Sequence, residues 1–349
     1  MWNNPAFDEH EKLTLVHDRA SGLSAIIAIH STHRGPAAGG TRFWHYANSK
    51  DAITDALRLS QGMSYKNAMA DLPIGGGKAV ILADADRTKT PEMLAAFADA
   101  VDALGGRYIT AEDVGITEAD MVAVSKRTRF VTGLPADESG AGGDPGPYTS
   151  RGIYLGLKAA VEHKLNRSLD GVHVALQGTG SVGSGLARLL AADGAKLTLA
   201  DMNEARVKAL AEELGAQTVA PDAIMTVPCD VFSPNALGGI LTPESIAALD
   251  CRIVAGGANN QLDRVDDGRL LADRGILYAP DYVLNAGGII AVSYEYFARI
   301  DGKPVDTDAI DTRISGIADR LREVWAEADS SGEPVNLVAD AMARRKIGR

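Results

Sequence analysis

The strongest constraint on the fold is a glycine-rich turn that follows a short apolar run at 172–176. Gly178, Gly180 and Gly183 have the spacing G-x-G-x-x-G, and an apolar pattern of helical period follows them. In such a turn the first glycine permits a tight turn, the second lets a pyrophosphate approach the backbone, and the third lets helix and strand pack closely. The N-terminus of the helix adds unpaired N–H groups and the positive end of its dipole, and both attract a phosphate.

The acid that such a site needs stands at the expected distance. A second predicted strand covers 196–200, and Asp201 follows it, where a carboxylate can accept a hydrogen bond from a ribose 2′-hydroxyl. The glycine spacing alone would be a weak signal in a chain with 37 glycines. Here strand, turn, helix, second strand and acid occur in order, which disfavours the alternative of a strand–helix turn without a ligand. The pattern therefore predicts a dinucleotide-binding Rossmann fold.

Apolar strands alternate with helices along the rest of the chain, which predicts βαβ units and an α/β fold with a parallel, doubly wound sheet. A chain of 349 residues is long enough for two domains. The segment 133–147, dense in Gly, Pro, Ser and Asp, marks the boundary. We expect an N-terminal α/β domain over 1–143, joined by C-terminal helices at about 305–349, and a Rossmann domain over 144–304, with a cleft between the two domains.

Composition excludes several classes of protein. The formal net charge of −11 gives no basic footprint for nucleic acid, and no apolar stretch approaches the ~18 residues of a membrane span. Cys229 and Cys251 cannot build a disulfide framework, and no Cys/His cluster has the spacing of a metal site. The N-terminal residues lack the pattern of a signal peptide. We therefore expect a cytoplasmic protein that binds no nucleic acid, membrane or metal ion.

Two lysines lie in apolar, glycine-rich sequence, where a lone ammonium is costly. Lys66 is near the end of a predicted helix over 51–69, and Lys78 closes a glycine segment, 72–78, that is predicted to be a loop, as is 35–40. The segment is not a phosphate-binding P-loop, because alanine follows the lysine where serine or threonine is required. A lysine buried beside another cation would have a lowered pKa and could act as a general base. The alternative for any lysine is a solvated surface charge.

Asp113 ends a predicted strand, and open α/β domains bind ligands at the carboxyl ends of their strands. A carboxylate there can hold an amine or offset nearby lysines, although a helix cap or a surface turn is the alternative. The polar segments 256–261 and 285–288 could bind a carboxamide, a ribose or a carboxylate, or could be simple turns. Two lysines, one aspartate and a nicotinamide would suit a substrate that carries both a carboxylate and an amine.

These residues lie in segments that resemble the glutamate/leucine/phenylalanine/valine dehydrogenase family along nearly the whole chain. The segments are GPAAGGTR (35–42), MSYK (63–66), LPIGGGK (72–78), TAEDVG (110–115), PYTSRG (147–152), QGTGSVG (177–183), CDVFSPNALGG (229–239), GGANNQL (256–262) and APDYVLNAGG (279–288). The resemblance implies NAD-dependent oxidative deamination of an L-amino acid to a 2-oxo acid with release of ammonia, and the reverse reductive amination. It also implies a homo-oligomer formed through the N-terminal domain, and domain closure with 133–147 and 285–300 as hinges.

The resemblance implies roles for the residues of the N-terminal domain. Lys78 would be the catalytic lysine that activates water, and Asp113 would mediate proton transfer at the amino group. Lys66 would bind the substrate carboxylate, helped by the backbone around Gly39 and Gly40 and by Asn285 of the other domain. Two lysines and an aspartate suit this chemistry, because the substrate carboxylate needs a cation and deprotonation needs a base with a tuned pKa.

The resemblance also implies which residues bind the cofactor. They are Thr149, Gly178, Gly180, Ser181, Val182, Gly183, Asp201, Met202, Ala236, Asn259 and Asn285. The charge of Asp201 would repel the 2′-phosphate of NADP, and Met202 offers no cation to bind it. The cofactor is therefore expected to be NAD.

The side-chain pocket that the resemblance implies is apolar, with Ala38, Ala111, Ile289 and Val292 as its lining. A glutamate side chain would bury an unpaired carboxylate there. The small Ala38 leaves room for a ring, and GPAAGGTR and LPIGGGK resemble phenylalanine dehydrogenases, so phenylalanine is favoured. TAEDVG instead resembles leucine dehydrogenases, and one methylene discriminates by only ~1–3 kcal/mol, so leucine or valine is the alternative substrate.

Two other functions remain alternatives at this point. The first is a catalytically inactive, NAD-binding regulatory protein, against which Lys66, Lys78 and Asp113 argue. The second is another Rossmann oxidoreductase, such as a 2-hydroxy-acid dehydrogenase. A dependence on ammonia separates this second alternative from an amino-acid dehydrogenase.

Overall fold

The computed structural model describes residues 2–137, 140 and 142–349, and it divides into two compact units. Unit 1 comprises Met1–Gly143, Val292–Thr307 and Ala343–Arg349, and unit 2 comprises Asp144–Ala291 and Asp308–Met342. The segment 133–147 contains the first break between the units, and its residues 138, 139 and 141 lie outside the described residues.

Unit 1 is built on a mixed five-stranded sheet in the order β1-β2-β4-β3-β5. The strands are β1 (Lys12–Asp18), β2 (Leu23–Ser31), β3 (Ala37–Trp44), β4 (Gly75–Leu82) and β5 (Tyr108–Ala111). Strand β3 is parallel to β4 and β5, whereas β2 is antiparallel to β1 and β4. The helices are α1 (Ser49–Met69), α2 (Pro91–Asp102), α3 (Glu118–Ser125) and α10 (Gly287–Asp301), the last of which begins in unit 2.

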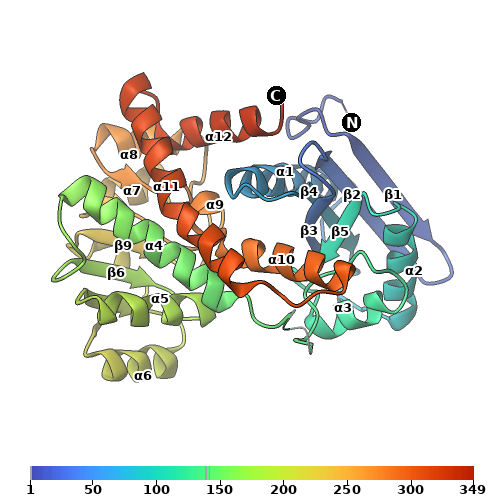
Figure 1. Ribbon diagram of the computed structural model, residues 1–349, viewed down its shortest axis with the longest axis horizontal. Coiled ribbons are helices and arrows are strands. Elements are labelled where there is room, and N and C mark those ends of the chain that lie inside the picture. The colour runs from blue at the N-terminus through green and yellow to red at the C-terminus, as the bar shows by residue number, and fades with distance from the viewer. Residues whose placement is uncertain (1, 138–139, 141) are drawn as a thin grey trace. The chain divides into compact units, whose positions relative to one another are not determined.

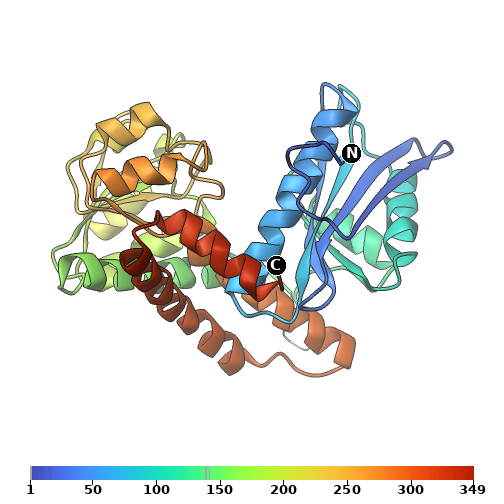
Figure 2. The ribbon, with the colours of Figure 1, turned by 90° about the horizontal axis from the view of Figure 1, so that it is seen from above.

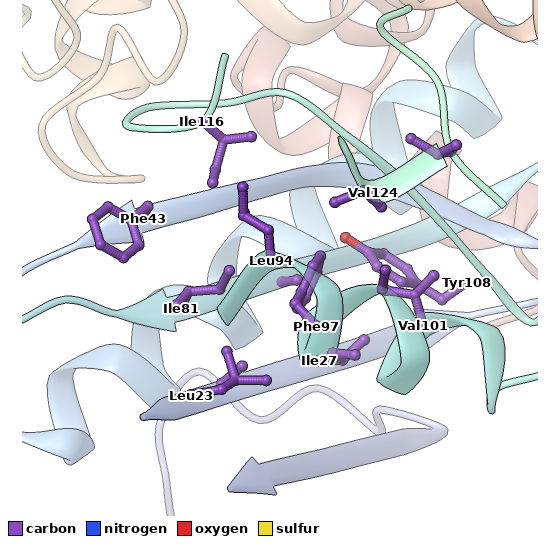
Figure 3. Packing of buried hydrophobic residues seen from close by; sticks show 14 of the residues in the cluster. Leu23, Ile27, Phe43, Ile81, Leu94, Phe97, Val101, Tyr108, Ile116 and Val124 are labelled. Carbon is purple, nitrogen blue, oxygen red and sulfur yellow. The ribbon is translucent and has the colours of Figure 1, made fainter. Parts of the chain in front are cut away.

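Both faces of this sheet are apolar, because side chains alternate between the faces along each strand. On one face Ile26, Ala28 and Val80 pack with Ala52 and Ala56 of α1. On the other face a larger core forms with α2 and α3, and several of its residues are labelled in Figure 3. Figure 2 shows α1 on one side of the sheet and α2 on the other. Because β2 and β4 are covered on both faces, their sequences are almost continuously apolar.

The prediction that 35–40 and 72–78 are loops is wrong for most of both segments, which lie in β3 and β4. Their glycines permit close packing of strands instead of turns. A Cβ atom on Gly39 would lie only 1.8 Å from the carbonyl oxygen of Gly77. Glycine is rare inside strands and usually marks a close backbone approach there. Sequence alone does not distinguish this use of glycine from a turn.

Unit 2 contains a six-stranded sheet in the order β11-β10-β9-β6-β7-β8, and every pair in it is parallel. The strands are β6 (His173–Gln177), β7 (Lys196–Ala200), β8 (Gln217–Thr218), β9 (Val231–Pro234), β10 (Ile253–Val254) and β11 (Leu277–Tyr278). The helices are α4 (Gly146–Leu165), α5 (Ser181–Ala192), α6 (Glu204–Leu214), α7 (Pro243–Ala248), α8 (Asp267–Asp273), α9 (Asp281–Leu284), α11 (Thr307–Ser331) and α12 (Val335–Lys346), with a 3₁₀ turn η1 at Ile224–Thr226. This is the doubly wound Rossmann order, which reverses between β6 and β9, the two strands of this sheet that are labelled in Figure 1. The sequence predicted the parallel, doubly wound sheet.

The C-terminal helices divide differently from the expectation. Residues 308–342, expected with the N-terminal domain, belong to unit 2, and 292–304, expected in the Rossmann domain, belong to unit 1. The indole Nε1 of Trp325 on α11 donates to the carbonyl oxygen of Tyr278 at 3.1 Å, and the apolar face of α11 packs against glycines of α4. The amphipathic sequence of α11 indicates that one face of the helix covers a hydrophobic core, but not which domain contains that core. The packing of α11 on unit 2 could therefore not be predicted from the sequence. Within the described part of the chain, every helix is too short or too polar to span a lipid bilayer.

The last segment of unit 1 is held to its first residues by two arginines. Arg344 Nη1 lies 3.0 Å and 3.1 Å from the two carboxylate oxygens of Asp8. Arg349 Nη1 lies 2.7 Å from His30 Nε2, and its Nη2 donates to the carbonyl oxygens of Glu9 and His30 at 2.8 Å and 3.0 Å. The basic end of the chain, to which the sequence assigned no role, thus completes the fold of unit 1.

Candidate active site

Lys78 and Asp113 form an ion pair in unit 1. Lys78 lies on β4 and is 6% exposed, Asp113 follows β5, and Lys78 Nζ is 2.5 Å from Asp113 Oδ2. Strand β3 separates β4 from β5, and Gly40 of β3 lies beside Lys78, since the next residues, Thr41 and Ala79, are paired. A Cβ atom on Gly40 would lie 2.9 Å from the Cβ of Asp113. The glycine therefore leaves the space in which the carboxylate reaches the lysine.

Arg42 is a second cation at the same carboxylate, and sequence reasoning did not single it out. Its Nε is 3.4 Å from Asp113 Oδ2, and its Nη1 donates to Asp55 Oδ2 of α1 at 2.8 Å. The hydroxyl of Tyr46 donates to the same Asp55 oxygen at 2.5 Å. Its position in the sheet was the available signal. Val80 lies two residues after Lys78 on β4, so the two side chains are on the same face of the sheet. Arg42 pairs with Val80 in the β3–β4 register and therefore lies on that face as well.

The electrostatics of this cluster favour a lysine that releases its proton. Burial lowers the pKa of Lys78, Asp113 acts in the opposite direction, and Arg42 lowers it further, so that the pKa lies below its ordinary value. Burial raises the pKa of Asp113, but the charges of Lys78 and Arg42 outweigh this, and the carboxyl pKa lies below its ordinary value. Asp113 is therefore ionised at neutral pH, beside a lysine that is easier to deprotonate than a solvated one.

Lys66 lies in the last turn of α1, which is joined to the start of β4. Asn67 Nδ2 donates to the carbonyl oxygen of Gly75 at 2.6 Å. A Cβ atom on Gly76 would lie 2.0 Å from the backbone nitrogen of Ser64, so glycine is required for this approach. The two predicted lysines are thus carried by elements that meet at residues 75 and 76.

The residues predicted for the substrate pocket fall in both units. In unit 1, Ala38 is buried on β3, Gly40 pairs with Ala111 in the β3–β5 register, and Val292 lies on α10. The hydroxyl of Tyr108 donates to the carbonyl oxygen of Gly39 at 2.7 Å, which fixes the backbone proposed to hold a carboxylate. Ile289 and Asn285 belong to unit 2.

The glycine turn of unit 2 has the form that a dinucleotide requires. Gly178 has φ +89°, and a Cβ atom on Gly183 would lie 1.9 Å from the carbonyl oxygen of Gly178, so the third glycine allows helix and strand to pack. A Cβ atom on Gly180 would meet nothing within 4 Å, which leaves open space at the N-terminus of α5. The helix begins at Ser181, and its N-cap residue is Gly180, so no side chain of the cap residue covers the terminus. These residues fit the pyrophosphate of NAD.

Asp201 follows β7 and is held in place by several donors. The backbone N–H and the hydroxyl of Thr179 donate to its Oδ2 at 2.6 Å and 3.0 Å, and Asn203 N–H donates to its Oδ1 at 2.8 Å. Burial raises its pKa, but these donors and Arg206 outweigh burial and lower the pKa to about 2. Arg206 is a partner that sequence reasoning missed, and Met202 is 86% exposed beside the pair.

The other residues predicted for the cofactor follow strands of the same parallel sheet. Ala236 follows β9 and Asn259 follows β10, so both lie at its carboxyl edge. Asn285 is the C-cap residue of α9, and its Nδ2 donates to the carbonyl oxygen of Gly257, after β10, at 3.1 Å. Asn285 Nδ2 donates to Asn259 Oδ1 at 2.9 Å, while its Oδ1 is buried and accepts no hydrogen bond from the described residues. Such an acceptor suits a ligand that donates, such as a carboxamide.

Thr149 and Val182 lie near the N-termini of two helices of unit 2. Thr149 Oγ1 donates to the carbonyl oxygen of Pro145, the N-cap residue of α4, at 3.0 Å. Ser150 Oγ donates to the carbonyl oxygen of Val182 at 2.8 Å and so joins α4 to the first turn of α5. Among the described residues, no three His, Cys, Asp or Glu side chains group in a way that could hold a metal ion.

The fold and these two groups of residues define a class of protein, a dinucleotide-dependent dehydrogenase built from two α/β units. Residues 10–130 match the Glu/Leu/Phe/Val dehydrogenase dimerisation domain, and residues 197–348 match the Glutamate/Leucine/Phenylalanine/Valine dehydrogenase domain. The chain belongs to the glutamate/leucine/phenylalanine/valine dehydrogenase family, whose members are NAD-dependent amino-acid dehydrogenases. The family, fold class, enzyme class and cofactor that the sequence predicted are thereby confirmed.

Individual relatives cover almost the whole chain. Leucine dehydrogenase of Thermoactinomyces intermedius is 44% identical over 97% of this chain and 91% of its own length. Valine dehydrogenase of Streptomyces virginiae is 43% identical over 97% of this chain and 94% of its own. The crystal structure of L-tryptophan dehydrogenase from Nostoc punctiforme superposes with a TM-score of 0.86 at 40% identity, over 97% of this chain and 96% of that one.

Proposed function

We propose that this protein catalyses the NAD-dependent oxidative deamination of a bulky apolar L-amino acid to its 2-oxo acid, with release of ammonia, and the reverse amination. The observation that carries the proposal is the ion pair of buried Lys78 and half-buried Asp113, with Arg42 beside it. The pair brings a lysine of lowered pKa, Lys78, into contact with a carboxylate, that of Asp113. A solvated surface lysine, the alternative that the sequence left open for Lys78, is inconsistent with this burial.

Each residue of the pair has a separate task in the proposal. Deprotonated Lys78 Nζ takes a proton from water as the water oxygen attacks the imino carbon. Asp113 accepts and returns a proton at the amino nitrogen, and Lys66 binds the substrate carboxylate as a counter-ion. When bound, NAD accepts the hydride from the α-carbon. Holding these groups in place supplies the proximity on which such catalysis depends.

For the cofactor, we propose that Gly178, Gly180 and Gly183 and the first turn of α5, Ser181 and Val182, hold the pyrophosphate, while Asp201 and Met202 flank the adenosine ribose. Thr149, Ala236, Asn259 and Asn285 are proposed to hold the nicotinamide half. Open space at Gly180 and the buried, unused acceptor of Asn285 support this assignment.

For the substrate side chain, we propose an aromatic amino acid, phenylalanine first, with leucine and valine as the second candidates. The small Ala38 supports the aromatic choice, as does the similarity to a tryptophan dehydrogenase. The relatives named leucine and valine dehydrogenases, at 42–44% identity, support the second. All of these names refer to apolar side chains, which agrees with the apolar character of the residues proposed for the pocket, Ala111 and Val292 in unit 1 and Ile289 in unit 2.

A substrate panel tests the proposal. NADH formation is measured at alkaline pH with L-phenylalanine, L-tryptophan, L-leucine, L-valine and L-glutamate, and NADH oxidation is measured with the matching 2-oxo acids, with and without ammonia. We expect turnover of an apolar amino acid, and NADH oxidation only when ammonia is present. Lys78→Ala should abolish activity, whereas Lys303→Ala, which removes an exposed lysine paired with Asp301, should not. Turnover of no apolar amino acid, or oxidation without ammonia, would refute the proposal.

We also propose that the chain forms a homo-oligomer through unit 1, in the reducing cytoplasm. Residues 10–130 match a domain described as a dimerisation domain. Strand β1 lies at an edge of the sheet, where Leu15 is exposed. Cys229 and Cys251 are free thiols, which suits a reducing compartment. Sedimentation equilibrium measures the oligomeric state, and a monomer at micromolar concentration would exclude this assembly.

A further inference from the structure

The basic segment 343–349 contacts the last turn of helix α1, which carries Lys66. We propose that this segment positions Lys66 and thereby sets the affinity of the protein for the substrate carboxylate. Arg344 and Arg349 are the positioning residues, and each acts through a polar residue near the start of the chain. The inference rests on the proposed function, in which Lys66 is the counter-ion of that carboxylate.

The carboxylate of Asp8 joins Arg344 to α1. Gln61 Nε2 donates to Asp8 Oδ2 at 2.8 Å, and the hydroxyl of Tyr65 donates to the same oxygen at 3.4 Å. Arg344 Nη1 donates to both oxygens of Asp8 and also to the hydroxyl of Tyr65, the last at 3.2 Å. Burial raises the pKa of Asp8, but the bonds from Gln61 and Arg344 outweigh burial and lower it to about 2, so the carboxylate is ionised at neutral pH. Arg344 thus fixes the residue that directly precedes Lys66.

His30 makes a second connection to α1 from an irregular position in β2. The residues on either side of it pair with Gly77 and Gly76, which are consecutive in β4, so His30 is the extra residue of a β-bulge. A bulge turns a side chain away from its regular direction. Here His30 Nδ1 lies 2.8 Å from Ser64 Oγ, two residues before Lys66. A Cβ atom on Gly76 would lie 2.3 Å from the same hydroxyl, so the bulge, β4 and α1 meet at Ser64.

Arg349 decides which way the histidine bond runs. Its Nη1 lies 2.7 Å from His30 Nε2, and because a guanidinium can only donate, Nε2 is the acceptor. Burial, Arg349 and His10 lower the pKa of His30 to about 4, although Asp8 Oδ2 lies 3.3 Å from the same nitrogen. At neutral pH the ring therefore carries one proton, on Nδ1, and donates it to Ser64 Oγ.

The backbone is held on both sides of Lys66. Ser64 and Tyr65 are bound before it, and after the helix Lys346 Nζ donates to Asp71 Oδ1 at 2.7 Å. Asp71 has φ +53°, so this bond holds a residue in the left-handed region that ends the turn. Fixing the backbone before the substrate arrives removes part of the ordering cost from binding. The segment should therefore contribute to the affinity for the carboxylate.

The catalytic lysine is held independently of this segment. Lys78 lies on β4, which pairs with β2 on one side and β3 on the other. Loss of Arg344 or Arg349 should therefore raise KM for the amino acid and change kcat little, the pattern of lost uniform binding. A general loss of structure would instead lower kcat as well and would raise KM for NAD.

Equilibrium binding of substrate fragments to the whole protein tests the inference by calorimetric titration, with and without NADH. 3-Phenylpropionate keeps the carboxylate of phenylalanine and lacks the amine, and 2-phenylethylamine keeps the amine and lacks the carboxylate. The corresponding pair for leucine is 4-methylpentanoate and 3-methylbutylamine. We expect Arg344→Ala and Arg349→Ala to weaken carboxylate binding by about tenfold and amine binding by less than about twofold. Lys66→Ala shows the affinity that remains without the counter-ion.

Two further variants keep the test valid if an alanine variant does not fold. All three bonds of Arg344 to Asp8 and Tyr65 come from one nitrogen, which a lysine ammonium can replace, so Arg344→Lys should bind the carboxylate nearly as well as the wild type. Ser64→Ala removes the acceptor of His30 on α1 without removing a charge, and should weaken carboxylate binding by about threefold. Thermal unfolding verifies that each variant is folded.

Arg127→Ala is the matched control. Arg127 forms an exposed pair with Asp99 in unit 1, at 2.6 Å and 2.7 Å, and its removal should change neither affinity. Carboxylate binding that Lys66→Ala weakens but the arginine variants and Ser64→Ala do not would overturn the inference, and so would an equal loss of both fragments. Carboxylate binding that is unchanged in Lys66→Ala would contradict the role of Lys66 and the inference with it. The expected binding changes without any turnover of an amino acid would contradict the proposed function alone.

Discussion

Lys78 and Arg42 share one carboxylate oxygen. Asp113 Oδ2 lies 2.5 Å from Lys78 Nζ and 3.4 Å from Arg42 Nε. The two cations compete for the negative charge, and each makes it less favourable for the other to stay protonated. Arginine does not release its proton in proteins, so the competition acts on the lysine alone. Arg42 is therefore placed to tune the lysine that we propose as the base.

Replacing Arg42 should move the pH dependence of the reaction. Arg42 lowers the pKa of Lys78, so Arg42→Met should raise that pKa and shift the acidic limb of the kcat/KM profile to higher pH, by about one pH unit. Arg42→Lys, which keeps the positive charge, should leave the limb between its positions in the wild type and in Arg42→Met. Arg127→Met, which breaks an exposed pair with Asp99, is the control. A limb that stays in place in Arg42→Met would show that the arginine does not act on the base.

Removing the charge of Asp113 should affect kcat more than KM. Asp113→Asn keeps the size of the side chain but cannot accept a proton, and loss of a general acid–base group costs about 10²–10⁴-fold in rate. Asp113→Ala should in addition lower the free energy of unfolding by about 1–3 kcal/mol, because buried Lys78 loses a partner. Steady-state kinetics and urea unfolding measure these effects separately. Equal kcat values for Asp113→Asn and the wild type would exclude the proposed proton transfer.

A methyl group on Gly40 should disturb the pair without removing a charge. The added Cβ would lie 2.5 Å from the carbonyl oxygen of Glu112 and 2.9 Å from Asp113 Cβ, so Gly40→Ala should displace Asp113 and reduce kcat/KM at least tenfold. Gly62→Ala in α1 meets nothing within 4 Å and should stabilise the helix by about 0.5–1 kcal/mol with activity unchanged. Kinetics and thermal unfolding compare the two. Full activity in Gly40→Ala would mean that the carboxylate tolerates displacement.

His30 should make unit 1 sensitive to acid. Burial, Arg349 and His10 lower its pKa from 6.5 to about 4, although Asp8 acts in the opposite direction. A lowered folded-state pKa gives stability that is complete above pH 6.5 and is lost as the pH falls through 4. The loss is about 3 kcal/mol, at about 1.36 kcal/mol per pH unit. The melting temperature should therefore fall less between pH 7 and 4 in His30→Gln than in the wild type. His17→Gln, on the exposed side of β1, should follow the wild-type curve.

The sequence was sufficient for the features that depend on local spacing. The glycine turn, the acid after β7 and the alternation of strands and helices all follow from the periodicity of neighbouring residues, and the structure has them. The partners of charged residues were not predictable, because packing decides them. Arg42 on β3 contacts Asp113, which follows the neighbouring strand β5 and comes 71 positions later in the chain. Nothing near Arg42 in the sequence indicates that contact. Arg206 was within reach of prediction, because it lies only one helical turn beyond Asp201.

Unit 1 cannot be obtained as a single continuous piece of the chain. Asp8 and Arg344 are 336 residues apart, and Arg349 contacts His30 across 319. A fragment that stops before residue 343 lacks both arginines, and one that begins after residue 30 lacks both of their acceptors. During synthesis, Asp8 and His30 cannot bind Arg344 and Arg349 until all of unit 2 has been synthesised, because both arginines follow unit 2 in the chain. The domain that is begun first is therefore the one that is completed last.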